Sequence, residues 1–224
     1  MMMNRRAMIN VSAAALLAGG GWWASRPAPG SDLLPGAAMA QDAAAPMEIT
    51  DMVLGNPDAA VEIIEYASYT CPYCARFHAN QFKDLKADYI DTGLIRFVYR
   101  EVYFDRPGLW ASMIARCAGE ERFHGITNLI YEQQQDWARE TNPAALVEKL
   151  KTIGRTVGMT DEVLDACMQD AALAQSLVSW YEANRDADGV NSTPTLFING
   201  QQYPNMAYPE LAALIDAALA EADG

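Results

Sequence analysis

The sequence predicts an α/β protein in which a helical insertion separates an N-terminal βαβ unit from a C-terminal ββα unit. Two β-prone runs, 61–67 and 94–102, flank a segment whose apolar residues recur at three- and four-residue steps. Residues 105–188 then show helical patterning without a convincing strand signal. Strand signals return at 195–203, before an amphipathic helix at 209–222. A strand, a crossover helix and a second strand in this order form a right-handed βαβ unit.

Residues 1–40 are expected to be an export signal and not part of the fold. Arg5 and Arg6 give a positively charged start, residues 11–23 form an apolar run, and small residues lead up to Ala40. This order is that of a signal peptide, and cleavage is expected after Ala40. The paired arginines are compatible with the twin-arginine route. An uncleaved anchor stays open as an alternative, although the apolar run is short for a membrane span.

Composition indicates a globular protein and argues against nucleic acid as a partner. Hydrophobic residues make up 51% of the chain and charged residues 20%, which is enough apolar material for a core. The formal net charge is −13. Binding to phosphates requires a basic face, so we expect no nucleic-acid partner.

The segment that carries chemistry is Cys71-Pro72-Tyr73-Cys74, at a predicted strand-to-helix turn. Two cysteines with this spacing at such a turn are typical of a redox pair. Cys71 would cap the helix, with Pro72 at the first helical position, where no N–H is needed. The free N–H groups and the dipole of the helix start favour the thiolate, which is the nucleophilic form. Cys74 lies one turn later and can close the ring or resolve a mixed disulfide.

Two other interpretations of these cysteines stay open. His78 follows Cys74 by four residues, so Cys71, Cys74 and His78 could be three ligands of a zinc ion. Structural zinc takes four ligands, usually with a second close pair, and the sequence has no second pair of this spacing. An inert structural disulfide is the other alternative. We favour the redox pair and expect no metal or cofactor.

Residues 48–222 resemble the DsbA-like branch of the thioredoxin superfamily. The resemblance rests on four features in order: the Cys-Pro-Tyr-Cys turn, the helical insertion, Thr193-Pro194 before a Leu-Phe-Ile strand with Asn-Gly, and the terminal helix. The bacterial subgroup with Tyr-Thr-Cys-Pro-Tyr-Cys-x-x-Phe-His is most similar. The resemblance implies a thioredoxin-like fold.

The expected domain organisation follows from this resemblance. After a signal peptide at 1–40, residues 41–224 would form one DsbA-like domain. Its thioredoxin core would comprise 48–104 and 189–222. The helical insertion would be 105–188, which is too long to be a loop.

The resemblance also implies a function. It is that of a periplasmic thiol:disulfide oxidoreductase that donates a Cys71-Cys74 disulfide to newly exported proteins, with Cys71 attacking and Cys74 resolving. A membrane quinone-linked, DsbB-like partner would reoxidise the protein, which is expected to be a monomer. A reductase or isomerase of the same fold is one alternative. A peptide-binding, chaperone-like module without redox activity is another.

Three further site residues come from the resemblance. Pro194 would follow a cis peptide bond and lie against the dithiol, which leaves the backbone of Thr193 free to pair with a substrate chain. A plain strand-entry proline is the alternative. Glu65 would be a buried acid that helps to move the proton of Cys74. From the neighbouring predicted strand, and not from the resemblance, Arg96 is expected to be its cationic partner. A solvent-facing glutamate is the alternative, because glutamate is rarely buried without a partner.

Cys117 and Cys167 both fall within apolar helical patterns of the insertion. A bridge between two helices is expected, since some members of the family carry a second, structural pair, and export would permit a disulfide. Two separate buried thiols are the alternative. His78 is expected to pack near the dithiol, with a redox-tuning role as a second interpretation. His124 is expected to be a solvated or partly buried helix residue.

Overall fold

The computed structural model describes residues 47–222 and Gly224. The expected export signal at 1–40, including its cleavage position and the anchor alternative, lies outside the described residues. Within the described part of the chain, no helix is both long enough and apolar enough to cross a membrane.

A five-stranded sheet forms the frame of the fold, in the order β1-β3-β2-β4-β5. Its strands are β1 (Met52–Gly55), β2 (Val61–Ala67), β3 (Ile95–Glu101), β4 (Thr195–Ile198) and β5 (Gln201–Pro204). Strands β2 and β3 pair in parallel, and the other pairs of this sheet are antiparallel. The expected βαβ and ββα units therefore share one sheet, and β2 lies at its centre.

The segment after Cys71 was expected to be one helix, and this expectation is wrong. The structure has α1 (Pro72–Ala79), α2 (Gln81–Leu85) and a π-helical turn, η1 (Lys86–Ile90). The break falls at Asn80, whose backbone leaves the helical region at φ −123° and ψ −87°. The Asn80 side-chain amide donates to the carbonyl of Arg76 at 2.8 Å, and such local bonds compete with helix continuation.

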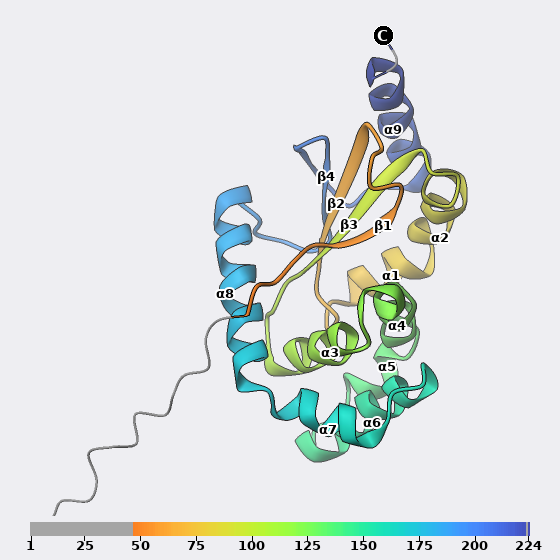
Figure 1. Cartoon of the computed structure of the whole chain (residues 1–224). Coiled ribbons are helices and arrows are strands. Elements are labelled where there is room, and N and C mark those ends of the chain that lie inside the picture. The colour runs from red at the N-terminus through yellow and green to blue at the C-terminus, as the bar shows by residue number, and fades with distance from the viewer. Residues whose placement is uncertain (1–46, 223) are drawn as a thin grey trace, which may run out of the picture. The chain divides into compact units, whose positions relative to one another are not determined.

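Six helices form the insertion, and polar side chains cap several of their starts. The side chains of Asp105, Asn142 and Thr160 accept hydrogen bonds from backbone N–H groups in the first turns that follow them. The helices are α3 (Arg106–Cys117), α4 (Glu120–Glu132), α5 (Gln134–Trp137), α6 (Pro143–Thr156), α7 (Asp161–Gln169) and α8 (Ala171–Asp188). Figure 1 shows α3 to α7 gathered beyond one end of the sheet and α8 along one side.

Two links hold α3 in place. Arg116 of α3 forms an ion pair with Glu101 of β3 at 2.6 Å, and both side chains are buried. A disulfide joins Cys117 to Cys167 of α7, with 6.3 Å between the Cα atoms. The insertion is thereby fixed both to the sheet and within itself.

The C-terminal unit closes the fold. Asn199 and Gly200 have positive φ values of 46° and 81°, as the tight turn between β4 and β5 requires. The last helix, α9 (Tyr208–Ala222), packs against the sheet with Leu211 and Ile215 fully buried. In Figure 1, α9 lies on the same side as α2, with which it is in contact.

Candidate active site: a dithiol at the start of a helix

The dithiol lies where β2 leads into α1. Cys71 is the N-cap of α1, with an extended backbone at φ −77° and ψ 119°, and Pro72 occupies the first helical position. Cys71 and Cys74 are free thiols, with exposed fractions of 8% and 0%. Cys71 therefore lies where the core meets the surface, whereas Cys74 is fully enclosed.

The two thiols differ strongly in acidity. A hydrogen bond with Cys74 is the largest cause that lowers the pKa of Cys71 from 9.0 to about 5. Burial opposes this shift, whereas hydrogen bonds with Thr193 and with the backbone N–H groups of Cys74 and Tyr73 add to it. Burial raises the pKa of Cys74 far above its usual range, and the hydrogen bond with Cys71 and the charge of Glu65 raise it further. At neutral pH the pair thus holds a thiolate on Cys71 and a thiol on Cys74.

The loop before β4 lies directly against Cys71. The Thr193–Pro194 peptide bond is cis. Cys71 Sγ lies 3.5 Å from the carbonyl oxygen of Thr193, across 122 positions of sequence, and donates to it when the thiol is protonated. Pro194 is buried and Thr193 is half-buried. The fold thus brings together four of the residues that the sequence singled out, namely Cys71, Cys74, Thr193 and Pro194.

Gln134 is a structural partner of this turn that the sequence did not indicate. Its buried side-chain amide donates to the carbonyls of Tyr69 and Cys71, at 2.8 and 2.9 Å. Through these bonds α5 of the insertion holds the backbone that precedes the dithiol. No local motif marks Gln134, because its role depends on where the insertion packs.

Glu65 is buried within β2 as predicted, but the prediction that Arg96 is its partner is wrong. Arg96 pairs instead with Glu62, which lies opposite it in the register of β2 and β3. Glu62 and Glu65 point to opposite faces of the strand, so Arg96 cannot serve both. The partner of Glu65 is His78 of α1, with Nε2 at 2.9 Å from Oε2.

His78 is enclosed by aromatic rings. It stacks on Tyr131 of α4 at 4.3 Å between ring centroids and lies 4.5 Å from the ring of Phe82. Its Nε2 faces Glu65 and is not available to the cysteines. Over residues 47–222 and 224, no group of three or more His, Cys, Asp or Glu side chains is arranged to hold a metal ion. His124 is partly buried in α4.

A recess in the surface adjoins the loop of Thr193. It encloses about 510 Å³ between the segment after β3, the end of α8 and the loop before β4. Tyr103, Phe104 and Tyr181 contribute aromatic rings to its lining. Phe104 is 60% exposed and Tyr73, beside the dithiol, is 58% exposed. Large aromatic side chains are therefore presented to solvent both at the dithiol turn and at this recess.

Comparison with known proteins agrees with this geometry. The family model described as "Thioredoxin" matches residues 47–217. A "Putative protein-disulfide oxidoreductase" of Rickettsia bellii is 36% identical over 172 residues, covering 76% of this chain and 65% of that protein. Disulfide bond formation protein D of Bacillus subtilis is 28% identical over 176 residues, covering 75% of this chain and 76% of that protein. The matched part spans less than two thirds of the length of the Rickettsia relatives.

A solved structure gives the same picture of the fold. Alpha-DsbA1 of Wolbachia pipientis superposes with a TM-score of 0.71 at 25% identity, covering 80% of this chain and 95% of that one. The thioredoxin-like fold expected from the sequence is thus confirmed. The chain belongs to the thioredoxin family and is DsbA-like within it.

Proposed function

We propose that this protein is a periplasmic thiol:disulfide oxidase that donates its Cys71–Cys74 disulfide to cysteine-containing exported proteins. The observation that carries the proposal is the position of Cys71, which caps α1 beside Cys74 and the loop of Thr193, and this position lowers its pKa to about 5. A stabilised thiolate stabilises the reduced enzyme, and an enzyme with a stable reduced form is a good oxidant.

The reaction consists of two exchanges. A substrate thiolate attacks Sγ of Cys71, the Cys71–Cys74 bond breaks, and Cys74 leaves as a thiolate that takes up a proton. The second substrate thiolate then attacks the substrate sulfur of the mixed disulfide, and Cys71 leaves as a stable thiolate. The substrate loses two electrons and two protons, and the enzyme gains the two electrons and keeps one proton on Cys74.

Glu65 has the role of proton donor to Cys74 in this proposal. It is fully buried, and once it has given up its proton its negative charge helps to hold that proton on Cys74 by raising the pKa of the thiol. A buried thiolate with such a high affinity for protons needs a nearby donor when the disulfide opens. Glu65 Oε1 has no hydrogen-bond partner among the described residues, which leaves that oxygen available for the transfer.

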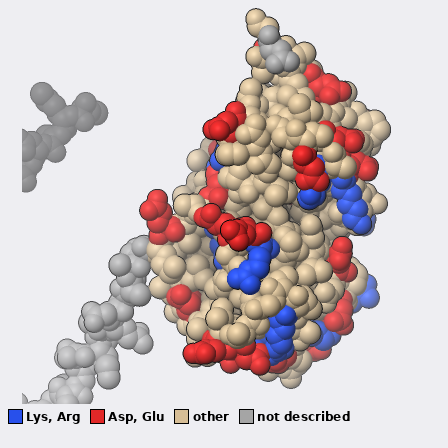
Figure 2. Space-filling view, turned by 45° about the vertical axis from the view of Figure 1, so that its right-hand side comes forward, with Lys and Arg blue, Asp and Glu red and all other residues tan. Residues whose placement is uncertain are grey.

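Substrate binding is assigned to the loop of Thr193 and the aromatic recess. Backbone groups beside Pro194 can pair with an extended chain, as in strand addition. The aromatic lining suits apolar side chains, which unfolded proteins expose. Acidic and basic side chains are interspersed on the face drawn in Figure 2, and the basic ones among the coloured residues form no continuous patch.

The expected compartment and partners complete the proposal. The sequence of residues 1–40 supports export, and the Cys117–Cys167 disulfide suits an oxidising compartment. After each turnover the reduced pair must be reoxidised, for which a membrane quinone-linked, DsbB-like protein is the expected partner. The active unit is proposed to be a monomer.

Equilibrium with glutathione tests the direction of the chemistry. We expect a reduction potential of about −220 mV, above the value of about −270 mV of thioredoxin. The oxidised protein should also convert a dithiol peptide to its disulfide, and Cys71→Ser should not. A potential at or below that of thioredoxin would select a reductase. Full protection of an unfolding protein from aggregation by Cys71→Ser, without any redox turnover by the natural chain, would select a chaperone-like binder.

A further inference from the structure

His78 has a second ring nitrogen that the contacts described above do not explain. Its side chain is only 3% exposed, and Nε2 is bonded to the fully buried Glu65. Nδ1 is buried and has no hydrogen-bond partner within the described part of the chain. Buried ring nitrogens without a partner are rare, because each such group loses its bonds to water.

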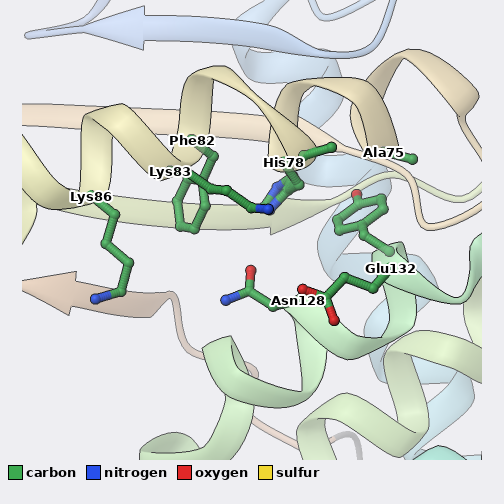
Figure 3. A pocket seen from close by; sticks show the side chains of 9 residues that line it. Ala75, His78, Phe82, Lys83, Lys86, Asn128 and Glu132 are labelled. Carbon is green, nitrogen blue, oxygen red and sulfur yellow. The ribbon is translucent and has the colours of Figure 1, made fainter.

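A cavity of about 110 Å³ lies directly beside this ring. Figure 3 shows it between α1 and α2 on one side and α4 on the other, with His78 and Lys83 across from Asn128 and Glu132. Lys83 and Glu132 are exposed, so the cavity reaches solvent at that end. A site of this size holds several water molecules, since one requires about 10–15 Å³.

The two observations join into one path. The charge of Glu65 acts on Cys74, Glu65 is bonded to His78, and His78 borders the cavity. A buried carboxyl that gives its proton to Cys74 must recover one before the next turnover, and Glu65 is itself fully enclosed. An imidazole suits this task because it can accept a proton at one nitrogen and donate from the other.

We propose that His78 relays protons between the water of this cavity and Glu65, so that the cavity is the proton port of the dithiol. This inference rests on the proposed oxidase function. When the Cys71–Cys74 bond opens, Glu65 gives its proton to the Cys74 thiolate. The Nε2 proton of His78 then passes to Glu65, and Nδ1 takes a proton from cavity water. One proton enters from solvent and one arrives at Cys74, so the step balances. On reoxidation the path runs in reverse.

The surroundings of His78 include other groups that titrate or carry charge. They are Glu65 on β2, Cys74 on α1, Tyr99 on β3, His124, Tyr131 and Glu132 on α4, Lys83 on α2, and Lys86 on η1. Burial raises the pKa of Tyr99 and of Tyr131 well above the usual range, so neither phenol exchanges a proton near neutrality. Lys83, Lys86 and Glu132 belong to the cavity and not to the bonded chain. His78 is thus the group that connects Glu65 to water.

Steady-state oxidation of a dithiol peptide, with glutathione disulfide as the terminal oxidant, tests the relay between about pH 6 and 8.5. The peptide disulfide is measured after acid quench. His78→Gln keeps an N–H donor for Glu65 but cannot pass a proton through. We expect its rate at about pH 8 to fall 10- to 100-fold, near the low end of general acid–base effects. Its equilibrium with glutathione should move by less than about twofold, because a relay changes the rate and not the end states. Added imidazole should restore the rate of His78→Ala, which extends the cavity.

Two further variants separate this role from a structural one. His124→Gln changes the other histidine, for which no bond to Glu65 is found, and should keep the natural rate. Asn128→Leu makes the cavity apolar while leaving His78 in place, and should slow the reaction as His78→Gln does. The relay is overturned if His78→Gln and Asn128→Leu both oxidise the peptide at the natural rate. It is also overturned if the loss in His78→Gln equals a shift of its glutathione equilibrium. If the natural chain itself fails to oxidise the peptide, the proposed function fails first.

Discussion

The reduction potential of the Cys71–Cys74 pair should depend on pH, and the pKa of Cys71 should set this dependence. The pKa of Cys71 is about 5 in place of 9.0, so at about pH 7 the thiolate stabilises the reduced protein by about two pKa units. At about 1.4 kcal/mol for each unit, this amounts to about 2.7 kcal/mol, or about 60 mV for a two-electron couple. In thioredoxin, the reactive cysteine has a pKa near 7 and the reduction potential is about −270 mV, so the thiolate stabilises the reduced protein by about 0.4 kcal/mol at about pH 7. The difference, about 50 mV, gives the value of about −220 mV expected here.

Lowering the pH removes this contribution. The pKa of Cys71 is depressed in the folded state, so its stabilisation of the reduced protein is complete above about pH 9 and is lost as the pH falls through about 5. Between about pH 5 and 8, reduction takes up one proton, on Cys74, for two electrons. The potential should then change by about −30 mV per pH unit, and by about −59 mV per unit below about pH 5, where Cys71 also binds a proton.

The assay is a glutathione titration at closely spaced pH values, together with the ultraviolet absorbance of the thiolate. Both should show a transition near pH 5. Tyr73→His places a second titratable group between the cysteines and should move the transition to lower pH. One uniform slope of about −59 mV per unit from about pH 4 to pH 8 would refute the reasoning, because Cys71 would then be protonated throughout.

The remaining predictions concern stability and are measured by denaturant unfolding. Replacing both Cys117 and Cys167 by Ala opens a loop closed across 50 positions and should reduce the free energy of unfolding by about 4 kcal/mol, while leaving the pKa of Cys71 in place. Arg116→Ala leaves Glu101 buried without its partner and should cost about 3–5 kcal/mol. Gly154→Ala places a Cβ 2.5 Å from a leucine methyl of α7 and should cost about 1–3 kcal/mol.

Two of these stability predictions have a control variant, and the third has a contradicting outcome. Gly125→Ala adds a Cβ with no non-local atom of the described residues within 4 Å, so it should stabilise α4 by up to about 1 kcal/mol. Replacing Arg116 by Met and Glu101 by Gln together should recover most of the loss, because no charge is then left buried. If the Cys117/Cys167 double variant has the same denaturant midpoint of unfolding as the natural chain, the predicted contribution of the disulfide to stability is contradicted.

Local signals in the sequence determined the dithiol turn and the start of α1. Cys71 caps α1 and Pro72 begins it, as their order along the chain predicts, because a cap depends on residues within one turn. The caps at Asn142 before α6 and Thr160 before α7 also act within one turn. Even the break at Asn80 is local in cause, but the apolar repeat on both sides of it concealed the break.

Only the tertiary structure decided which distant groups meet. Glu65 pairs with His78 and not with Arg96, because strand register and side-chain face give Arg96 to Glu62. Gln134 reaches the dithiol turn because the insertion packs there, although nothing in its neighbourhood along the chain indicates it. A sequence specifies the period and the caps of its elements within a few residues. Partners far apart along the chain are selected by packing, where a single face or register excludes the others.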